Sequence, residues 1–302
     1  MTERKNDGRI KMNLFEVLRG ERTIPQVINH LDEEMRGVLG RDVRAFLDRT
    51  VSGALEDQIC FVRVPKCATT SVHTEITRAY RSLWCFPGNG LQHVHPGACD
   101  DAAEGLGDDV TTWDVRRRVL SYFLAHPKTS YTWGHVCINE QILTQFGGEY
   151  SFITTIRNPV DRWLSHYLYN KHRAKSDPRY DIHTGIEKFL DTERGRGIGQ
   201  MYIAYFAGAG SASYEERESD ELQQKARENL KRFDLVGFVD DFPRFQRQFE
   251  NRFDAEMNLR KRNTSPAPEG AKDISEDLRD QIREVCSADM EFYEWAKDEY
   301  LN

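Results

Sequence analysis

An apolar run passes directly into a loop of small and hydroxyl-bearing residues in the segment Ile59-Cys-Phe-Val-Arg-Val-Pro-Lys-Cys-Ala-Thr-Thr-Ser71. The run from Ile59 to Val64 is typical of a buried strand. After the loop, apolar residues recur at helical spacing: Val72, Ile76, Ala79 and Leu83. The segment therefore predicts a strand, a tight loop and a helix. The first N–H groups of a helix are unpaired and lie at the positive end of its dipole, so such a loop is a candidate phosphate site.

The loop differs from the nucleotide-binding loop of common kinases and NTPases. That loop reads Gly-x-x-x-x-Gly-Lys-Ser/Thr, with its lysine near the end. Here Lys66 comes first, and no glycine occurs between Pro65 and Ser71. A shorter and stiffer loop suits one terminal phosphate better than a wrapped triphosphate. The sequence therefore disfavours an ordinary kinase or NTPase.

A second strand, loop and helix are predicted in Tyr150-Ser-Phe-Ile-Thr-Thr-Ile-Arg-Asn-Pro-Val-Asp-Arg-Trp-Leu-Ser-His-Tyr167. Residues 152–156 form a buried, β-branched strand pattern, and Pro159 is typical of a first helical position because its missing N–H would be unpaired there. The apolar stripe of this helix follows helical spacing: Val160, Trp163, Leu164, Tyr167 and Leu168. Arg157 at the strand tip and Ser165 about two turns into the helix can converge on one anion, because arginine offers a charged fork and serine a hydroxyl donor.

The two segments together resemble sulfotransferases that use 3′-phosphoadenosine 5′-phosphosulfate (PAPS). The residues that resemble their 5′-phosphosulfate loop are Pro65, Lys66, Cys67, Ala68, Thr69, Thr70 and Ser71. The segment from Arg157 to Tyr167 resembles their 3′-phosphate motif. The pattern is most similar to the carbohydrate branch, which includes the uronyl and heparan sulfate 2-O-sulfotransferases. The resemblance begins near Asp57 and reaches the C-terminus; it implies PAPS as donor, PAP as product and no metal.

The resemblance also implies roles in the reaction. Lys66, with the N–H groups of its loop, is expected to stabilise the leaving phosphate, while Arg157 and Ser165 hold the 3′-phosphate. His135, in Thr132-Trp-Gly-His-Val136, is similar to the Gly-His element that supplies the catalytic base. A neutral histidine suits that task near pH 7. The alternatives for the base are His93, His95 and Glu140.

Two further elements are expected near the donor. The segment from Leu259 to Ser265 resembles the loop that closes over the nucleotide in this family. It adds three donor-binding candidates: Arg262, Asn263 and Thr264. Arg162 is a secondary candidate, which either assists Arg157 or pairs with Asp161 or Asp177.

The chain of 302 residues, with 39% hydrophobic residues and no break in composition, is expected to form one α/β unit. Strands are predicted at residues 59–64, 130–134, 152–156 and 233–239, with helices between them. This order predicts a P-loop-like, three-layer fold: a central, mostly parallel sheet flanked by helices, with ligands at the carboxyl ends of the strands. Residues 1–56 are expected to be a helical extension, and 57–302 the sulfotransferase domain. The glycine-rich stretch 86–109 is predicted to be an irregular loop that forms part of the acceptor pocket.

Charge and composition narrow the partners. The net charge of −7 disfavours a nucleic-acid partner and weakens the case for a highly anionic acceptor such as heparan. No apolar run approaches the ~20 residues of a membrane helix, and the N-terminus lacks a hydrophobic signal core. The six cysteines show no CxxC spacing, and Cys85, Cys99, His93 and His95 match no standard zinc pattern. We therefore expect free thiols, no metal, no membrane partner and a cytoplasmic location, unless an anchor was removed; the sequence specifies no oligomeric state.

The favoured hypothesis is in-line transfer of a sulfuryl group from PAPS to a hydroxyl of a carbohydrate or another small acceptor. Two alternatives remain at the level of sequence. One is a nucleotide kinase-like phosphotransferase with the same loop architecture. The other is a catalytically silent PAP-binding protein.

Overall fold

A parallel sheet forms the centre of the molecule. The computed structural model describes residues 55, 57–80, 90–173, 182–259 and 274–301. Its five strands have the order β2-β3-β1-β4-β5, and every neighbouring pair is parallel. The strands are β1 (Ile59–Val62), β2 (Leu91–Val94), β3 (Tyr131–Gly134), β4 (Ser151–Ile156) and β5 (Leu235–Phe238). The predicted fold class is confirmed.

The register brings the ends of three strands to one edge of the sheet. Val62, the last residue of β1, lies opposite Gly134, the last residue of β3, and opposite Thr154 of β4. Because β4 continues only to Ile156, the residues that follow β1, β3 and β4 meet at the same carboxyl edge. Ligands of parallel α/β sheets bind at this edge.

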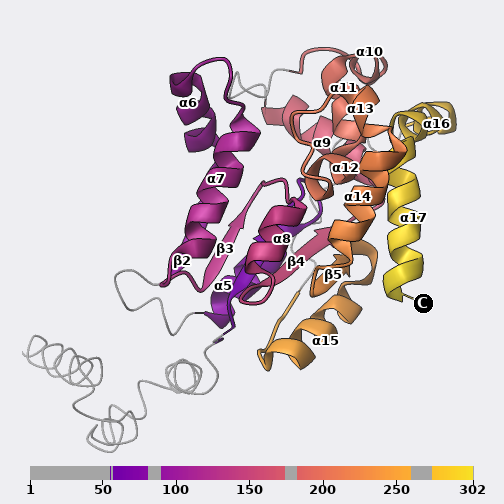
Figure 1. Cartoon of the computed structure of the whole chain (residues 1–302). Coiled ribbons are helices and arrows are strands. Elements are labelled where there is room, and N and C mark those ends of the chain that lie inside the picture. The colour runs from indigo at the N-terminus through magenta and orange to yellow at the C-terminus, as the bar shows by residue number, and fades with distance from the viewer. Residues whose placement is uncertain (1–54, 56, 81–89, 174–181, 260–273, 302) are drawn as a thin grey trace, which may run out of the picture.

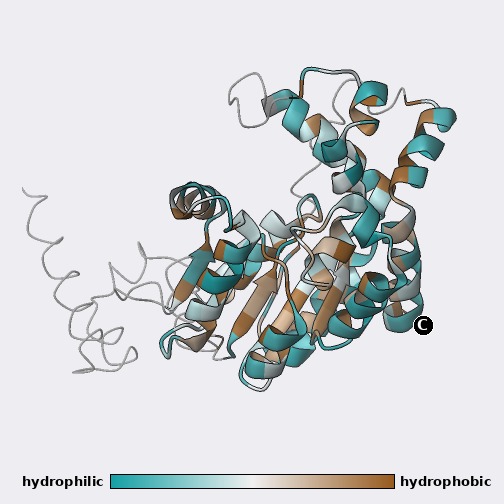
Figure 2. Cartoon of the chain, turned by 45° about the horizontal axis from the view of Figure 1, so that its top comes forward, coloured by the Kyte–Doolittle hydropathy of each residue, from teal (hydrophilic) through white to brown (hydrophobic). Residues whose placement is uncertain are grey.

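Helices cover both faces of the sheet. One face is covered by α5 (Thr69–Ala79) and α15 (Phe242–Phe253), and its core includes Ile59, Phe61, Ile76 and Phe249. The alternate residues of β1, Cys60 and Val62, point to the opposite face, as the period of two requires. That face is covered by α7 (Thr112–Ala125), α8 (Glu140–Phe146), α12 (Met201–Phe206), α14 (Asp220–Leu230) and α17 (Ser287–Leu301). In Figure 2 the strands are largely brown, while much of the surrounding helical surface is teal.

A third hydrophobic cluster lies beyond the carboxyl edge. It is built from α9 (Pro159–Arg173), α10 (Ile186–Leu190), α11 (Glu193–Gly199) and α16 (Glu276–Val285). Figure 1 shows α9, α10, α11 and α13 gathered past one end of the sheet. The remaining elements are α6 (Pro96–Leu106), α13 (Tyr214–Arg217) and the short 3-10 helix η3 (Val239–Asp241).

The predicted irregular loop at 86–109 is wrong for most of its length. Residues 91–94 form the edge strand β2, and residues 96–106 form α6. The signals of a helix start outweigh the glycines, because the His95 side chain accepts a hydrogen bond from the Ala98 N–H and Pro96 occupies the first turn. Smaller differences concern boundaries: β1 ends at Val62 rather than Val64, and β5 is shorter than the predicted 233–239.

Some predictions fall outside the described residues. The N-terminal extension does, apart from Leu55, and so does the part of the first helix that was to include Leu83. Arg262, Asn263 and Thr264, which were predicted to close over the nucleotide, also lie outside the described residues.

Candidate active site

The loop between β1 and α5, here named the lysine loop (residues 65–71), has an unusual backbone. Lys66 and Ala68 have φ angles of 68° and 53°, in the left-handed region that non-glycine residues rarely occupy. Such conformations cost free energy and tend to persist where a site needs them. Ala68, the N-cap residue of α5, has no side-chain oxygen to offer, and among the described residues its carbonyl accepts only the Ser71 N–H, at 3.1 Å. Left-handed residues at a helix start form a concave row of N–H groups suited to an anion.

Cys67 anchors the lysine loop to the sheet. Its carbonyl accepts a hydrogen bond of 2.8 Å from Thr155 Oγ1 on β4, and its Sγ lies 3.5 Å from the Tyr202 hydroxyl. Burial raises the pKa of the Cys67 thiol to about 11, so the side chain remains a neutral thiol at pH 7. Cys67 therefore supports the loop from behind.

Lys66 links the lysine loop to α9. Its Nζ lies 3.6 Å from the centre of the Tyr169 ring, a cation–π distance. The ammonium group is thereby directed toward the helix that follows β4. The lysine loop thus contacts the helix that carries most of the second motif.

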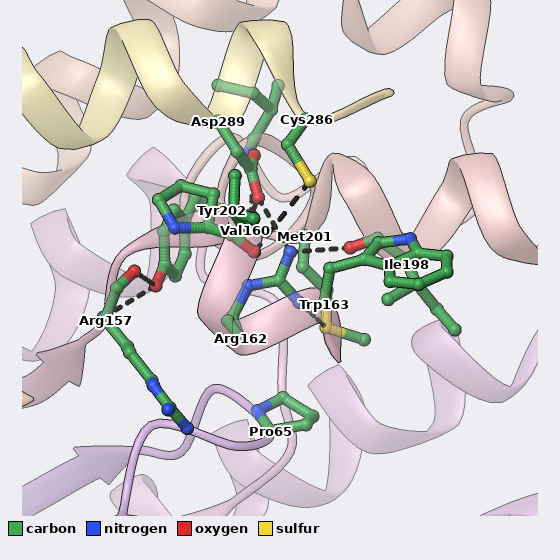
Figure 3. Close-up of polar contacts among 12 residues, drawn as sticks. Pro65, Arg157, Val160, Arg162, Trp163, Ile198, Met201, Tyr202, Cys286 and Asp289 are labelled. Carbon is green, nitrogen blue, oxygen red and sulfur yellow. Dashed lines mark hydrogen bonds and ion pairs between the residues drawn. The ribbon is translucent and has the colours of Figure 1, made fainter. Parts of the chain in front are cut away.

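The second motif, here named the arginine corner (Arg157 to Ser165), follows β4. The Arg157 N–H donates to the Tyr202 hydroxyl at 2.7 Å, and that hydroxyl donates to the Arg157 carbonyl. Figure 3 shows the Arg157 side chain extending toward the loop that carries Pro65. Within the described ranges, no carboxylate forms an ion pair with Arg157. Ser165 is partly exposed on α9.

Arg162 does not belong to the binding surface. It is fully buried, its Nη2 lies 3.2 Å from Asp289 on α17, and it donates to the Ile198 carbonyl at 2.6 Å (Figure 3). Burial is the largest single effect and lowers the pKa of Arg162, but the neighbouring groups, Asp289 foremost, together outweigh it and the net shift is upward. The predicted pairing with Asp161 is wrong, since Asp161 pairs with Arg279; Asp177 lies outside the described residues.

His135 directly follows β3 and is held in one tautomer. Its Nδ1 lies 2.6 Å from the Arg63 carbonyl oxygen. A carbonyl can only accept, so Nδ1 carries the proton and Nε2 keeps its lone pair. Burial, followed by the charge of Arg63, lowers the pKa of His135 to about 4. His135 is therefore neutral at physiological pH, with an unprotonated nitrogen available.

The alternatives for the base have other surroundings. Nδ1 of His95 accepts the N-cap hydrogen bond of α6, at 3.1 Å from the Ala98 nitrogen. His93 is exposed and stacks on Trp133 with ring centres 5.2 Å apart. Glu140 is exposed in the first turn of α8.

Two residues inside the motif segments escaped assignment from sequence. Arg63 follows β1 and donates to Thr70 Oγ1 at 3.3 Å, and its charge lowers the pKa of His135 after the larger effect of burial. His166 on α9 has a buried Nδ1 without a hydrogen-bond partner, and burial followed by the charges of Arg162 and Lys66 lowers its pKa to about 3. A charged residue that ends a buried strand is the signal that could have identified Arg63.

A profile described as the sulfotransferase family matches residues 53–296. The chain belongs to the sulfotransferase family. It is accordingly an enzyme that uses PAPS as sulfuryl donor. Among solved structures, a sulfotransferase from Alicyclobacillus acidocaldarius is similar, with 14% identity and a TM-score of 0.33 over 76% of this chain and 96% of that one. No curated protein matches the sequence.

The residues of this sulfotransferase fit a donor with anionic groups at both ends. Lys66 and Arg157 supply a positive charge at the ends of the neighbouring strands β1 and β4, and the start of α5 supplies N–H donors. Within the described part of the chain, no cluster of three or more His, Cys, Asp or Glu side chains could hold a metal ion. Among the described helices, none combines the length and apolar character needed to cross a bilayer.

Proposed function

We propose that this sulfotransferase holds PAPS between the lysine loop and the arginine corner and transfers the sulfuryl group to a hydroxyl of a carbohydrate or another small acceptor, with His135 as general base. One observation carries the proposal. The two cationic segments follow adjacent parallel strands and are joined by the Thr155–Cys67 hydrogen bond and by the Tyr202 hydroxyl.

The donor side of the proposal rests on charge. When bound, PAPS supplies a sulfuryl group whose departure leaves negative charge on the 5′-phosphate. Lys66 and the N–H groups from Ala68 to Ser71 would stabilise that charge, as preorganised donors do in other group transfers. Arg157 and Ser165 would hold the 3′-phosphate through a charged fork and a hydroxyl.

The acceptor side rests on His135. Its Nε2 can accept the proton of an incoming hydroxyl, because Nδ1 already donates to the Arg63 carbonyl. The same carbonyl stabilises the imidazolium that forms, since it continues to accept from Nδ1. The neutral starting state follows from the lowered pKa of His135.

The cleft between α6 and α7 favours an acceptor that is not strongly anionic. A cavity of about 460 Å³ is lined there by Asp100, Glu104, Asp108, Trp113 and Arg116, among others. Arg116 pairs with Asp100 at 2.8 Å and donates to the His135 backbone carbonyl at 3.4 Å, so one residue of the cavity lining contacts the backbone of the proposed base. Its carboxylates would repel a highly sulfated polymer. We therefore favour a neutral carbohydrate or small alcohol.

A cytoplasmic location belongs to the same proposal. Cys60, Cys67, Cys99, Cys137 and Cys286 are buried, free thiols. Unpaired cysteines are usual in a reducing compartment.

Product analysis and nucleotide binding test the proposal together. The purified protein is incubated with PAPS and a panel of neutral sugars and phenols, and mass spectrometry detects sulfated product. In a separate experiment, calorimetry measures the affinity for PAP. We expect the His135→Ala variant to lose about 10²- to 10⁴-fold in turnover while PAP affinity is retained. His95→Ala is the matched control, with turnover close to that of the wild type. Unchanged turnover in His135→Ala would show that His135 is not the general base. Absence of PAP binding to the wild type would contradict the proposed donor site.

A further inference from the structure

Tyr202 lies at the meeting point of the two motifs, although it belongs to neither. It occupies the first turn of α12, and its side chain is fully buried. Its hydroxyl accepts from the Arg157 N–H at 2.7 Å, donates to the Arg157 carbonyl and lies 3.5 Å from Cys67 Sγ. One phenolic oxygen therefore contacts both the lysine loop and the arginine corner.

The contact replaces pairing that the sheet no longer supplies. The β4 strand ends at Ile156, so both backbone polar groups of Arg157 lie past the end of the strand. Buried backbone groups require partners, and the Tyr202 hydroxyl satisfies the N–H and the carbonyl at once. The direction in which the Arg157 side chain leaves the backbone is fixed in this way (Figure 3).

Tyr202 is itself fixed from the far end of the chain. Its N–H lies 2.9 and 3.0 Å from the two carboxylate oxygens of Asp289, and the Ile203 N–H lies 3.2 Å from one of them. Gln200, the N-cap residue of α12, offers no side-chain hydrogen bond, so Asp289 provides the cap. Arg162 of the arginine corner pairs with the same carboxylate and lies over the Tyr202 ring at 5.2 Å.

We propose that Tyr202 is a positioning residue for the donor, whose hydroxyl sets the spacing between the lysine loop and the arginine corner. The inference rests on the proposed donor site. A nucleotide that engages both segments depends on their spacing, whereas a nucleotide that lacks the 3′-phosphate does not. Loss of the hydroxyl therefore weakens binding selectively, and a general loss of stability would not have this selectivity.

The test compares the binding of PAP and AMP to the Tyr202→Phe variant by calorimetry, with competition for weak binding. AMP is the matched ligand because it lacks only the 3′-phosphate. We expect PAP affinity to fall about 5- to 20-fold, the size of effect that loss of one hydrogen-bonding group produces, and AMP affinity to change less than about twofold. The Michaelis constant for PAPS should rise by the same factor as the PAP Kd, with a smaller change in kcat.

Tyr150→Phe is the control for the loss of a buried hydroxyl. Tyr150 is 2% exposed and donates to the Thr129 carbonyl at 2.8 Å, before β4 begins. We expect this variant to keep the wild-type ratio of PAP to AMP affinity. An equal change of that ratio in both variants, or an unchanged ratio in Tyr202→Phe, overturns the inference.

An Arg157→Ala arm separates the inference from the donor site on which it rests. If Arg157→Ala loses the preference for PAP while Tyr202→Phe keeps it, the inference alone fails. If Arg157→Ala also keeps the preference, the assigned donor site fails and the inference fails with it. Loss in both variants, with Tyr150→Phe unchanged, supports the positioning role.

Discussion

The lysine loop and the arginine corner offer similar charges but are built differently. In the lysine loop, the geometry lies in the backbone, where Lys66 and Ala68 adopt left-handed conformations. In the arginine corner, the geometry lies in the side chains of Arg157 and of the start of α9. There the Val160 N–H donates to Asn158 Oδ1 at 3.1 Å and caps the helix. The buried ion pair between Arg162 and Asp289 connects α9 to α17 and holds α9 in place.

This difference predicts that substitutions in the two segments affect different properties, sulfuryl transfer in one case and stability in the other. In the lysine loop, Lys66 is partly exposed, so its replacement is expected to alter transfer while leaving the fold intact. The arginine corner depends on Asp289, 127 residues further along the chain than Arg162, so a change beneath it is expected to reduce stability first. The following predictions challenge or refine this contrast.

The largest effect is expected beneath the arginine corner. Asp289→Ala leaves the fully buried Arg162 without its anion and removes the cap of α12, so the free energy of unfolding should fall by about 3–5 kcal/mol. Chemical denaturation measures this change. Asp161→Ala is the control, because its pair with Arg279 is 3.8 Å long and partly exposed; it should cost about 0–1 kcal/mol. Equal losses in the two variants would contradict a supporting role for the buried pair.

Lys66→Met should reduce kcat by about 10²- to 10³-fold, as removal of a donor to developing negative charge does elsewhere. Its thermal stability should stay close to that of the wild type, because the side chain lies at the surface of the loop on the Tyr169 ring. Steady-state kinetics with PAPS and a thermal melt measure both. A rise in the Michaelis constant with unchanged kcat would restrict Lys66 to ground-state binding.

Arg157→Lys tests whether the arginine corner needs a fork or only a charge. A lysine retains the charge but loses the second parallel donor, so the Michaelis constant for PAPS should rise by about tenfold with little change in kcat. Ser165→Ala, which removes one hydroxyl, should raise it by about threefold. The reverse order of these two effects would place the 3′-phosphate nearer to Ser165 than to Arg157.

The smallest effect is expected in the pH profile. Burial and then Arg63 lower the pKa of His135 to about 4, so protonation removes its lone pair only as the pH falls toward that value. Between about pH 5.5 and about pH 7.5, where an ordinary histidine titrates, kcat/KM for PAPS should therefore stay nearly level. A drop centred near the ordinary histidine value would show that the base is solvated or is another group.

The sequence was sufficient for the architecture because its signals are local. The strands at residues 59 and 152 are apolar runs bounded by loops, and Pro159 marks a helix start. The edge strand β2 and α6 were missed because glycines and an exposed strand face obscure both periodicities. The position of Arg162 within the second motif also led to a wrong prediction, because its partner Asp289 lies in α17, far along the chain.

The residues that hold the candidate site in place could not be predicted from sequence motifs or periodicity. Tyr202 is 45 residues from Arg157, and Asp289 is a further 87 residues from Tyr202. Neither belongs to a motif, and each has an ordinary appearance for a helical residue. Only the packing of α12 and α17 brings them beneath the two segments that the sequence identified.

The separation of Arg162 and Asp289 by 127 residues has a consequence for biosynthesis. On the ribosome, both strand-loop-helix motifs emerge long before α17. Until Asp289 is available, Arg162 would be a desolvated cation without a counterion, which is strongly unfavourable. The nascent chain is therefore expected to acquire nucleotide affinity only after α17 has left the ribosome and can pack against α9 and α12.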